Sequence, residues 1–282
     1  MLTKDLANKD VLIYGLGLSG NSCLKYLKKN NNVKVFDDNI LLKNEKYNKL
    51  FLNKNEIFKL EFDYIVLSPG IDIQKCKLNK YLLKNREKII TELDIFYLTY
   101  PDNKKITITG TNGKSSTCQM LYKIFSSNKL DVRLVGNIGN SPLSELKIKK
   151  KTIFIIEASS YQISYSKYFK TDYAVILNLS IDHLERHNNL KNYAHAKIKL
   201  ICDQKKYKLS YIERDCIIIN KYLSKKKVNS KLVKITYNKD SFFKKKINNS
   251  YLLDRNSLNN IHFVYKISKK FKISDFKIFK SL

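Results

Sequence analysis

The chain has 282 residues, of which 43% are hydrophobic, so it is long enough for about two domains and too apolar to be disordered. Its formal net charge of +29 would suit nucleic-acid binding, but the Lys and Arg residues are scattered and form no basic arm. Five widely spaced cysteines without a C-x-x-C pair argue against a zinc site or a disulfide framework. No apolar run reaches the length of a signal-peptide core or a membrane span. We therefore expect a soluble cytoplasmic protein with neither a nucleic-acid nor a membrane partner.

Short runs of β-branched and aromatic residues recur along the chain and predict strands. These runs lie at residues 11–14, 33–36, 64–67, 105–109, 153–156, 173–177 and 216–219. Helical stretches between several of them are predicted at 21–29, 115–125 and 192–202. Strands that alternate with helices predict an α/β fold with parallel sheets. The polar, Lys- and Asn-rich stretch from 225 to 250 predicts no element.

A domain boundary is expected within "ITELDIFYLTYPDNKK", residues 90–105. The first run of strands and helices stops there, and Pro101 begins a turn-forming stretch before a new strand. We place a first domain at residues 1–93 and a second at residues 94–282.

The eight glycines occupy only four places, and each place follows a predicted strand. They are Gly15, Gly17 and Gly20; Gly70; Gly110 and Gly113; and Gly136 and Gly139. Glycine allows sharp turns and close approach of the backbone to a ligand, and ligands of open α/β sheets bind at the carboxyl ends of strands. The glycines therefore predict binding loops.

The N-terminal glycine loop, residues 15–20, has the pattern G-x-G-x-x-G between a strand and a helix. Asp37 ends the next predicted strand, where a carboxylate can bind a ribose hydroxyl. These are features of a dinucleotide fingerprint and indicate NAD. The same turn also fits another nucleotide diphosphate, or no ligand at all, so the pattern alone leaves the ligand open.

The phosphate loop, residues 110–115, follows a strand and begins a helix. Its backbone N–H groups and Lys114 predict a polyphosphate site, and Ser115 places a hydroxyl for Mg²⁺. The loop departs from G-x-x-x-x-G-K-[ST] because Ile108 stands where the first glycine would be.

Two further polar residues end predicted strands near this loop. Glu157 follows an apolar strand from which its carboxylate can reach the loop's Mg²⁺, and His183 follows the strand at 173–177. Either side chain also has an ordinary structural interpretation, as an edge acid or a lone histidine. We expect His187 and His195 to be surface residues.

Several of these segments, taken in order, resemble the Mur ligases. The match rests on "GLGLSG", "ITGTNGKSST", "VGNIGNSPL", "EASSYQI" and "NLSIDHLERHNNLKNYAHAKIKL". The resemblance implies a Rossmann-like N-terminal domain that holds the UDP part of the substrate, followed by a P-loop-type central ATPase domain. The form E-x-S-S-Y-Q resembles the branch that adds D-glutamate to UDP-N-acetylmuramoyl-L-alanine in peptidoglycan synthesis.

The resemblance also implies roles for individual residues, with ATP and Mg²⁺ as cofactors. Catalytic roles fall to Lys114, Glu157, His183 and Lys197. ATP binding falls to Gly110, Thr111, Asn112, Gly113, Lys114, Ser115, Ser116, Asn256 and Asn259, although Arg255 replaces the usual His beside the last two. Metal ligands would be Ser115, Glu157, His183 and Lys197, the lysine that the family carbamylates. Substrate contacts would be Leu18, Ser19, Asp37, Gly70, Asn137, Ser159 and His183.

The implied reaction is ATP-dependent carbon–nitrogen ligation through an acyl phosphate. The family has a third, C-terminal domain that brings the acceptor amino acid, and no third run of strands and helices follows here. The resemblance thus implies a truncated chain that is inactive alone, with a separately encoded C-terminal fragment as a partner. The alternative function is a NAD-dependent oxidoreductase using the N-terminal glycine loop. The sequence does not fix the acceptor amino acid, the carbamylation of Lys197 or the oligomeric state.

Overall fold

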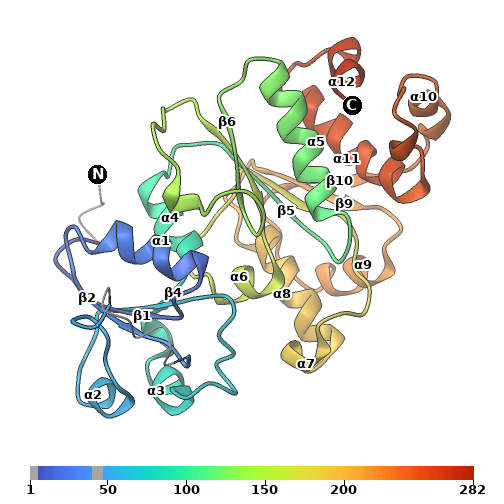
Figure 1. Ribbon diagram of the computed structural model, residues 1–282. Coiled ribbons are helices and arrows are strands. Elements are labelled where there is room, and N and C mark those ends of the chain that lie inside the picture. The colour runs from blue at the N-terminus through green and yellow to red at the C-terminus, as the bar shows by residue number, and fades with distance from the viewer. Residues whose placement is uncertain (1–5, 40–46) are drawn as a thin grey trace. The chain divides into compact units, whose positions relative to one another are not determined.

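The computed structural model describes residues 6–39 and 47–282 (Figure 1). They cluster into two compact units. The first contains Met1–Pro101, Ser141–Leu146 and Ser164–Phe169, and the second contains Asp102–Asn140, Lys147–Ile163 and Lys170–Leu282. The units divide after Pro101, and the expected division at 93/94 lies within helix α4 (Glu92–Thr99).

The first unit is built on a parallel four-stranded sheet in the order β2-β1-β3-β4. Its strands are β1 (Asp10–Tyr14), β2 (Asn32–Phe36), β3 (Tyr64–Leu67) and β4 (Ile89–Ile90). Its helices are α1 (Leu18–Leu27), α2 (Lys54–Phe58), α3 (Asn79–Lys84) and α4 (Glu92–Thr99), with a 3₁₀ turn η3 (Arg86–Lys88). The three strands predicted for this region are confirmed.

Buried Asp94 links α4 to the late segment Ser164–Phe169 of the first unit. The α4 helix begins with a capping box in which Thr91 and Asp94 bond each other's backbone N–H groups. The second oxygen, Asp94 Oδ1, accepts hydrogen bonds from the N–H groups of Lys167 (2.8 Å), Tyr168 (2.6 Å) and Phe169 (2.9 Å). A buried carboxylate needs such donors, so this side chain ties residues 167–169 to α4.

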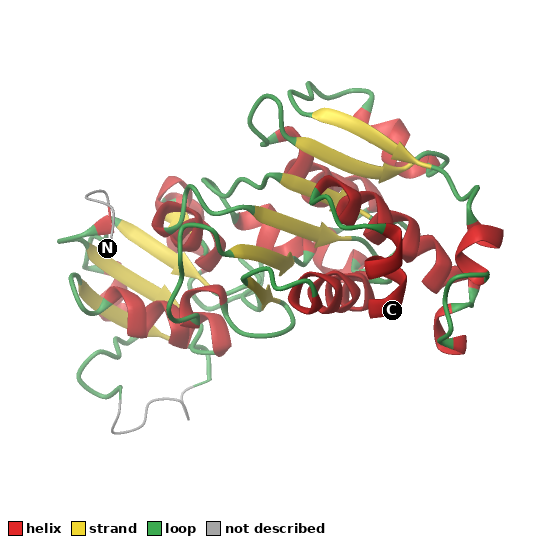
Figure 2. Cartoon of the chain, turned by 90° about the horizontal axis from the view of Figure 1, so that it is seen from above, coloured by secondary structure: helices red, strands yellow, loops and turns green. Residues whose placement is uncertain are grey.

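The second unit is built on a parallel six-stranded sheet in the order β10-β9-β8-β5-β7-β6. Figure 2 shows the strands in yellow with the helices beside them in red. The unit's strands are β5 (Lys105–Thr109), β6 (Val132–Gly136), β7 (Ile153–Glu157), β8 (Tyr173–Ile176), β9 (Leu209–Glu213) and β10 (Lys231–Ile235). Its helices are α5 (Lys114–Ser127), α6 (Ser160–Tyr165), α7 (Leu184–His187), α8 (Leu190–Cys202), α9 (Ile217–Leu223), α10 (Asp240–Lys244), α11 (Arg255–Lys270) and α12 (Asp275–Ser281). The last two residues of α6 cluster with the first unit. The second unit also contains the 3₁₀ turn η5 (Ser250–Leu252), whereas the 3₁₀ turn η4 (Pro142–Ser144) belongs to the first unit. Both sheets are parallel throughout, which confirms the predicted α/β class.

The central strand β5 shows how the two faces of this sheet are covered. Ile106 and Ile108 join a buried apolar cluster with residues of α5, α11 and α12. Alternate residues of a strand point to opposite faces, so Thr107 and Thr109 face the other side. There Lys197 of α8 reaches Thr109, and α8 packs along β8. All six strands run in the same direction, so their carboxyl ends lie at the same end of the sheet.

One prediction for the last third of the chain is wrong. Residues 216–219 were expected as a strand but belong to α9 and its N-cap, because Ile219 and Leu223 are buried at helical spacing while Ile217 is 81% exposed. The stretch from 225 to 250 contains β10 and α10. The Lys-rich β10 is an edge strand, where charged side chains are common and apolar alternation is weak.

Among the described residues, no helix is both long and apolar enough to cross a membrane.

Candidate functional site

The phosphate loop joins β5 to α5 through four residues, 110–113, and its shape requires glycine. Gly113 is the N-cap of α5 and has a φ of 80°. A Cβ atom at this position would lie 2.6 Å from the side chain of Asn260. The glycine therefore lets the loop pack closely against Asn260 of α11, and the first N–H groups of α5 have no acceptor within the helix. This arrangement suits an anion such as a phosphate.

Two predicted lysines meet at the same carbonyl of this loop. Lys114 Nζ donates to the carbonyl oxygens of Gly110 (2.9 Å) and Thr111 (2.7 Å). Lys197 Nζ also donates to Gly110 O, at 2.9 Å, and its side chain is buried. Burial and the nearby Lys114 charge lower the pKa of Lys197 to about 7. Two lysine side chains thus lie beside the proposed phosphate position.

Glu157 joins two other predicted residues at the end of β7. The side chain is 1% exposed, and the strand register places it beside Ile108 of β5 and Gly136 of β6. Its Oε2 accepts a hydrogen bond from Ser115 Oγ (2.8 Å), and Oε1 accepts one from Asn137 Nδ2 (3.0 Å). A buried carboxylate beside a hydroxyl at a phosphate loop offers the oxygen ligands that Mg²⁺ prefers, with phosphate oxygens completing its shell.

The other expected metal ligand, His183, lies apart from this group of contacts. It is the N-cap of α7, and its ring nitrogens lie 3.6 Å from carboxylate oxygens of Asp182 and Glu185. Its ring also packs 5.1 Å from that of Tyr161. In residues 6–39 and 47–282, no three His, Cys, Asp or Glu side chains cluster closely enough to hold a metal ion by themselves. The predicted set thus fits Mg²⁺ only as an ion shared with a phosphate ligand.

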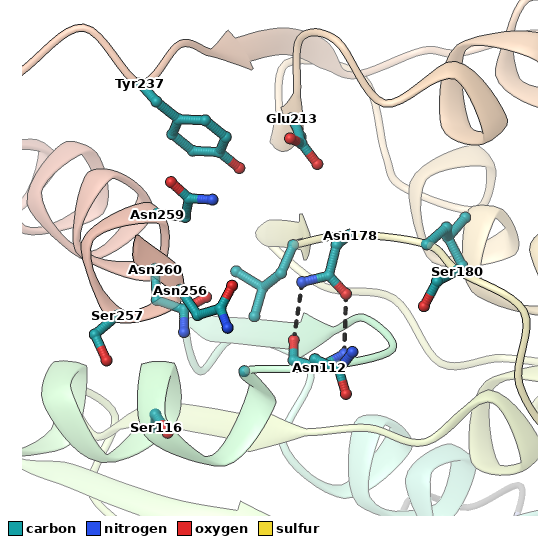
Figure 3. Close-up of a pocket in the computed structure, with 13 residues that line it drawn as sticks. Asn112, Ser116, Asn178, Ser180, Glu213, Tyr237, Asn256, Ser257, Asn259 and Asn260 are labelled. Atoms are coloured by element: carbon teal, nitrogen blue, oxygen red, sulfur yellow. Dashed lines mark hydrogen bonds between the residues drawn. The ribbon is translucent and has the colours of Figure 1, made fainter. Parts of the chain in front are cut away.

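A cavity of about 520 Å³ adjoins the phosphate loop (Figure 3). At one end it is lined by loop and α5 residues, including Asn112 and Ser116. Across from them, Asn256 and Asn259 project from α11, one turn apart on the same face. The two asparagines predicted to contact adenine therefore share a cavity with the predicted phosphate site.

Sequence reasoning missed several polar residues that line this cavity. Three of them, Asn178, Glu213 and Tyr237, end or follow β8, β9 and β10 respectively. Glu213 and Tyr237 are hydrogen-bonded to each other, and burial raises the pKa of both groups. A polar residue at the carboxyl end of a parallel strand is the signal that would have found all three.

The expectation that His187 is a surface residue is wrong, whereas His195 is partly exposed. His187 is 9% exposed, and its Nε2 lies 2.9 Å from Ser160 Oγ. Its ring stacks on Tyr161 at 5.3 Å. His195 is half-buried and packs edge-on against Tyr222. The amphipathic pattern of α8 and the shortness of α7 gave no sign of these ring contacts.

Ser159, a predicted substrate contact, caps the turn that leads into α6. Its N–H donates to Gln162 Oε1 (2.9 Å), and its Oγ accepts from the Gln162 N–H (3.2 Å). The "SSYQ" segment is thus held in a reciprocal cap directly after Glu157. Ser159 itself is half-buried.

The N-terminal glycine loop lies in the first unit and depends on two of its glycines for packing. A Cβ at Gly20 would lie 1.7 Å from Gly15 O, whereas a Cβ at Gly17 would meet nothing within 4 Å. Asp37 Oδ2 accepts a hydrogen bond from the N–H of Leu16 at 2.7 Å. The loop is therefore closed on the helix side and open at Gly17, where a ligand can approach.

The other predicted contacts in this unit lie around that opening. Leu18 is 89% exposed at the start of α1, and Ser19 is half-buried beside it. Gly70 is exposed, with open space around the position of a Cβ.

Two family models match the chain. The Mur ligase middle domain covers residues 108–274, and the Mur ligase MurD-like N-terminal domain covers residues 9–90. Among similar proteins is the UDP-N-acetylmuramoylalanine–D-glutamate ligase of Rickettsia prowazekii, 31% identical over 96% of this chain and 65% of its own length. The enzyme of the same name from Buchnera aphidicola is 35% identical over 82% of this chain and 54% of its own.

Solved structures show the same fold. The UDP-N-acetylmuramate:L-alanyl-gamma-D-glutamyl-meso-diaminopimelate ligase of Neisseria meningitides superposes with a TM-score of 0.63 at 14% identity, covering 98% of both chains. MurF ligase from Thermotoga maritima, in complex with ADP, gives a TM-score of 0.53 at 14% identity, covering 99% of this chain and 67% of its own.

The matches span 41% to 65% of the length of these and similar curated relatives. The Rickettsia bellii ligase, for example, is 33% identical over 73% of this chain and 47% of its own length. These relatives are ligases, and they give no support to a nicotinamide-dependent oxidoreductase. The N-terminal glycine loop lies in the MurD-like domain, and the phosphate loop with Glu157 lies in the middle domain. The chain belongs to the Mur ligase family.

Proposed function

We propose that this chain supplies the ATP-binding and UDP-substrate-binding parts of a cytoplasmic ligase that joins D-glutamate to UDP-N-acetylmuramoyl-L-alanine. The observation that carries the proposal is the buried Glu157 carboxylate, hydrogen-bonded to Ser115 and Asn137 at the foot of the phosphate loop. The names of the relatives and the match to a MurD-like N-terminal domain support this choice of substrates.

ATP would occupy the cavity beside the phosphate loop. Its adenine would lie toward Asn256 and Asn259 of α11, and its phosphates toward the first N–H groups of α5 and Lys114. Glu157 and Ser115 would hold Mg²⁺, which when bound neutralises phosphate charge. These side chains would fix the γ-phosphoryl group in line with the incoming nucleophile, which is the main requirement of phosphoryl transfer.

The reaction needs activation, because a carboxylate is a poor acylating agent without a leaving group. An oxygen of the terminal L-alanine carboxylate attacks the γ-phosphorus of ATP, forming an acyl phosphate and releasing ADP. The amine of D-glutamate then attacks the acyl carbon, and the tetrahedral intermediate loses inorganic phosphate and a proton to give the amide. Lys114, beside the loop, would stabilise negative charge on the transferring group.

Two further residues would act around the metal. By resemblance to the family, Lys197 would carry a carbamate formed from CO₂, which replaces a cation with a carboxylate ligand. The exposed His183 would be a ligand of a second Mg²⁺ and contact the substrate. Both assignments depend on the family resemblance rather than on direct contact with Glu157.

The first unit would hold the UDP group. The open face at Gly17 lies beside Leu18 and Ser19, and Asp37 offers a carboxylate to a hydroxyl or imide N–H donor. Gly70 would allow close approach of the nucleotide backbone. In the second unit, Asn137 and Ser159 would orient the muramoyl-alanine end.

Ligand binding and a trapping assay test this function. We expect Mg²⁺-dependent binding of ATP and separate binding of UDP-N-acetylmuramoyl-L-alanine by calorimetry, with no binding of NADH. Hydroxylamine, a small amine that needs no acceptor site, should trap the acyl phosphate as a hydroxamate in the presence of ATP. Tight NADH binding without ATP binding would overturn the proposal, and hydroxamate formation without ATP would exclude the acyl-phosphate route.

A further inference from the structure

Asn178, two residues beyond β8, is hydrogen-bonded to the phosphate loop through both polar atoms of its side chain. Its Oδ1 accepts from the N–H groups of Thr111 (3.0 Å) and Asn112 (2.9 Å). Its Nδ2 donates to the carbonyl oxygen of Asn112 at 3.1 Å, as Figure 3 shows. The Thr111 N–H also approaches the carbonyl oxygen of Asn178 itself, at 3.2 Å.

A second set of contacts holds the same part of the loop. The Ser180 N–H donates to Thr111 Oγ1 at 3.0 Å, and the hydroxyl of Tyr193 on α8 lies 3.1 Å from that oxygen. Residues 110–113 belong to no helix or strand, so their conformation has to come from contacts of this kind. The stretch after β8 thus supplies the partners of the first half of the loop.

These bonds divide the N–H groups of the loop into two sets. Asn178 engages those of Thr111 and Asn112, which are therefore not directed at a phosphate. The N–H groups in the first turn of α5, from Lys114 onward, have no acceptor within the helix. An incoming polyphosphate would bind this second set of N–H groups. The position of these groups depends on the hydrogen bonds that hold the first set.

We propose that Asn178 is a positioning residue that presets the phosphate loop for a nucleoside polyphosphate. This inference rests on the proposed function, since it assumes that the loop binds ATP. Its distinguishing consequence is that the effect of Asn178 grows with the number of phosphates on the ligand. A residue that merely lines the cavity would affect adenosine and ATP alike.

The test measures the affinity of the full 282-residue chain for adenosine, ADP and ATP in the presence of Mg²⁺. Asn178→Ala should weaken ADP and ATP binding about tenfold, the scale expected when a loop N–H loses its partner, and adenosine binding less than about twofold. Asn259→Ala is the matched control, because it makes the same change at the other end of the cavity. It should weaken all three ligands by a similar factor.

Asn178→Asp is a second variant, which keeps the test decisive if Asn178→Ala does not fold. Aspartate has the same shape and keeps the oxygen that accepts from the Thr111 and Asn112 N–H groups, but it adds negative charge near the phosphates. We expect an unfolding midpoint close to that of the unaltered chain, and a loss of affinity that rises from ADP to ATP. Equal losses for adenosine and ATP, or no loss in either variant, would overturn the role of Asn178. An unaltered chain that binds neither ADP nor ATP would instead refute the proposed function, and this inference with it.

Discussion

The two glycine-containing loops have the same place in their sheets but different electrostatic surroundings. Each follows a strand and begins a helix, at residues 15–20 and at 110–115. Both loops contact a carboxylate, since Asp37 accepts from the Leu16 N–H and Glu157 accepts from Ser115 Oγ. The phosphate loop also contacts Lys114 and Lys197, which donate to its carbonyl oxygens. A glycine-containing turn between a strand and a helix therefore does not by itself specify the ligand.

The difference lies in the added positive charge at the phosphate loop. A carboxylate attracts hydrogen-bond donors, such as sugar hydroxyls or the N–H of a base. The Lys114 ammonium group and a helix N-terminus favour a polyphosphate. The Asp37 carboxylate does not separate NAD from a UDP-sugar, because both ligands carry ribose hydroxyls and a diphosphate.

The largest expected effect tests whether the phosphate loop, unlike its N-terminal counterpart, works with a metal ion. Glu157→Gln keeps the size and hydrogen-bonding capacity of the side chain but removes its charge. We expect it to reduce Mg²⁺ affinity at least about a hundredfold, since even partners of metal ligands contribute up to that factor. The dissociation constant of ATP, measured with and without Mg²⁺, shows this change in Mg²⁺ dependence directly.

Glu145→Gln, which neutralises a carboxylate outside the phosphate-loop contacts described above, is the control and should leave the Mg²⁺ dependence intact. If Glu157→Gln binds ATP with the same Mg²⁺ dependence as the unaltered chain, Glu157 is a structural acid, and the two loops differ less than proposed.

The next effect tests the closed side of the N-terminal glycine loop. In Gly20→Ala the new methyl group would collide with Gly15 O, so we expect a loss of about 2–3 kcal/mol in the free energy of unfolding, as for other overpacked positions. Urea unfolding monitored by circular dichroism measures it.

Gly17→Ala is the matched control, because the same methyl group meets open space. It should leave stability nearly unchanged and instead weaken binding of UDP-N-acetylmuramoyl-L-alanine. Equal destabilisation by both substitutions would mean that the open face at Gly17 does not exist in solution.

A smaller effect tests the cationic character of the phosphate loop. Lys114→Met keeps an apolar stem but removes the ammonium group, and we expect ATP affinity to fall about tenfold because a charged hydrogen-bond donor is lost. Calorimetric titration of ATP and of adenosine provides the measurement. The exposed Lys225→Met should change neither value. An unchanged ATP affinity in Lys114→Met would remove the main contrast between the loops.

The smallest effect concerns His187, the buried histidine at the end of α7. His187→Phe keeps the aromatic ring but breaks the hydrogen bond with Ser160, and should cost about 1 kcal/mol of unfolding free energy near neutral pH. Burial lowers the pKa of His187, so the unfolded chain takes up the proton more readily. The stability contributed by neutral His187 is therefore present above its ordinary pKa and is lost as the pH falls below it.

Ser160→Ala separates the two contributions. It removes the same hydrogen bond but keeps the titrating ring, so it should retain the acid-induced loss of stability that His187→Phe lacks. Unfolding curves at neutral and mildly acidic pH distinguish the variants. Identical pH dependence in both would show that His187 does not titrate on unfolding.

Local sequence patterns predicted the interior of the fold better than its edges. The strands β7 and β8 have β-branched, mostly apolar sequences because both faces of a parallel sheet are covered, and β5 alternates Ile with Thr. The edge strand β10 has lysines at its first and fourth positions, and no prediction covered it. The run "CIII" shows the opposite error, since β-branched residues occur in α9, where burial of one helical face outweighs their propensity.

The site residues that belong to a recognisable sequence motif could be predicted. Lys114, Ser115 and Glu157 follow recognisable patterns, and the structure brings them together. Asn178 and Glu213 do not, because their roles depend on which strands lie next to one another. The order β9-β8-β5-β7 arises from long-range pairing, which no short stretch of sequence encodes.

The three N–H groups that converge on Asp94 also have a consequence for how the chain folds during synthesis. Asp94 is made early, but its donors at residues 167–169 come after β5, α5, β6 and β7. Until those residues leave the ribosome, the carboxylate lacks its partners and the first unit lacks its last segment. Pairings so distant in sequence form late and slowly. The N-terminal unit therefore matures together with the unit that follows it, and a nascent chain of about a hundred residues is not yet an independent folding unit.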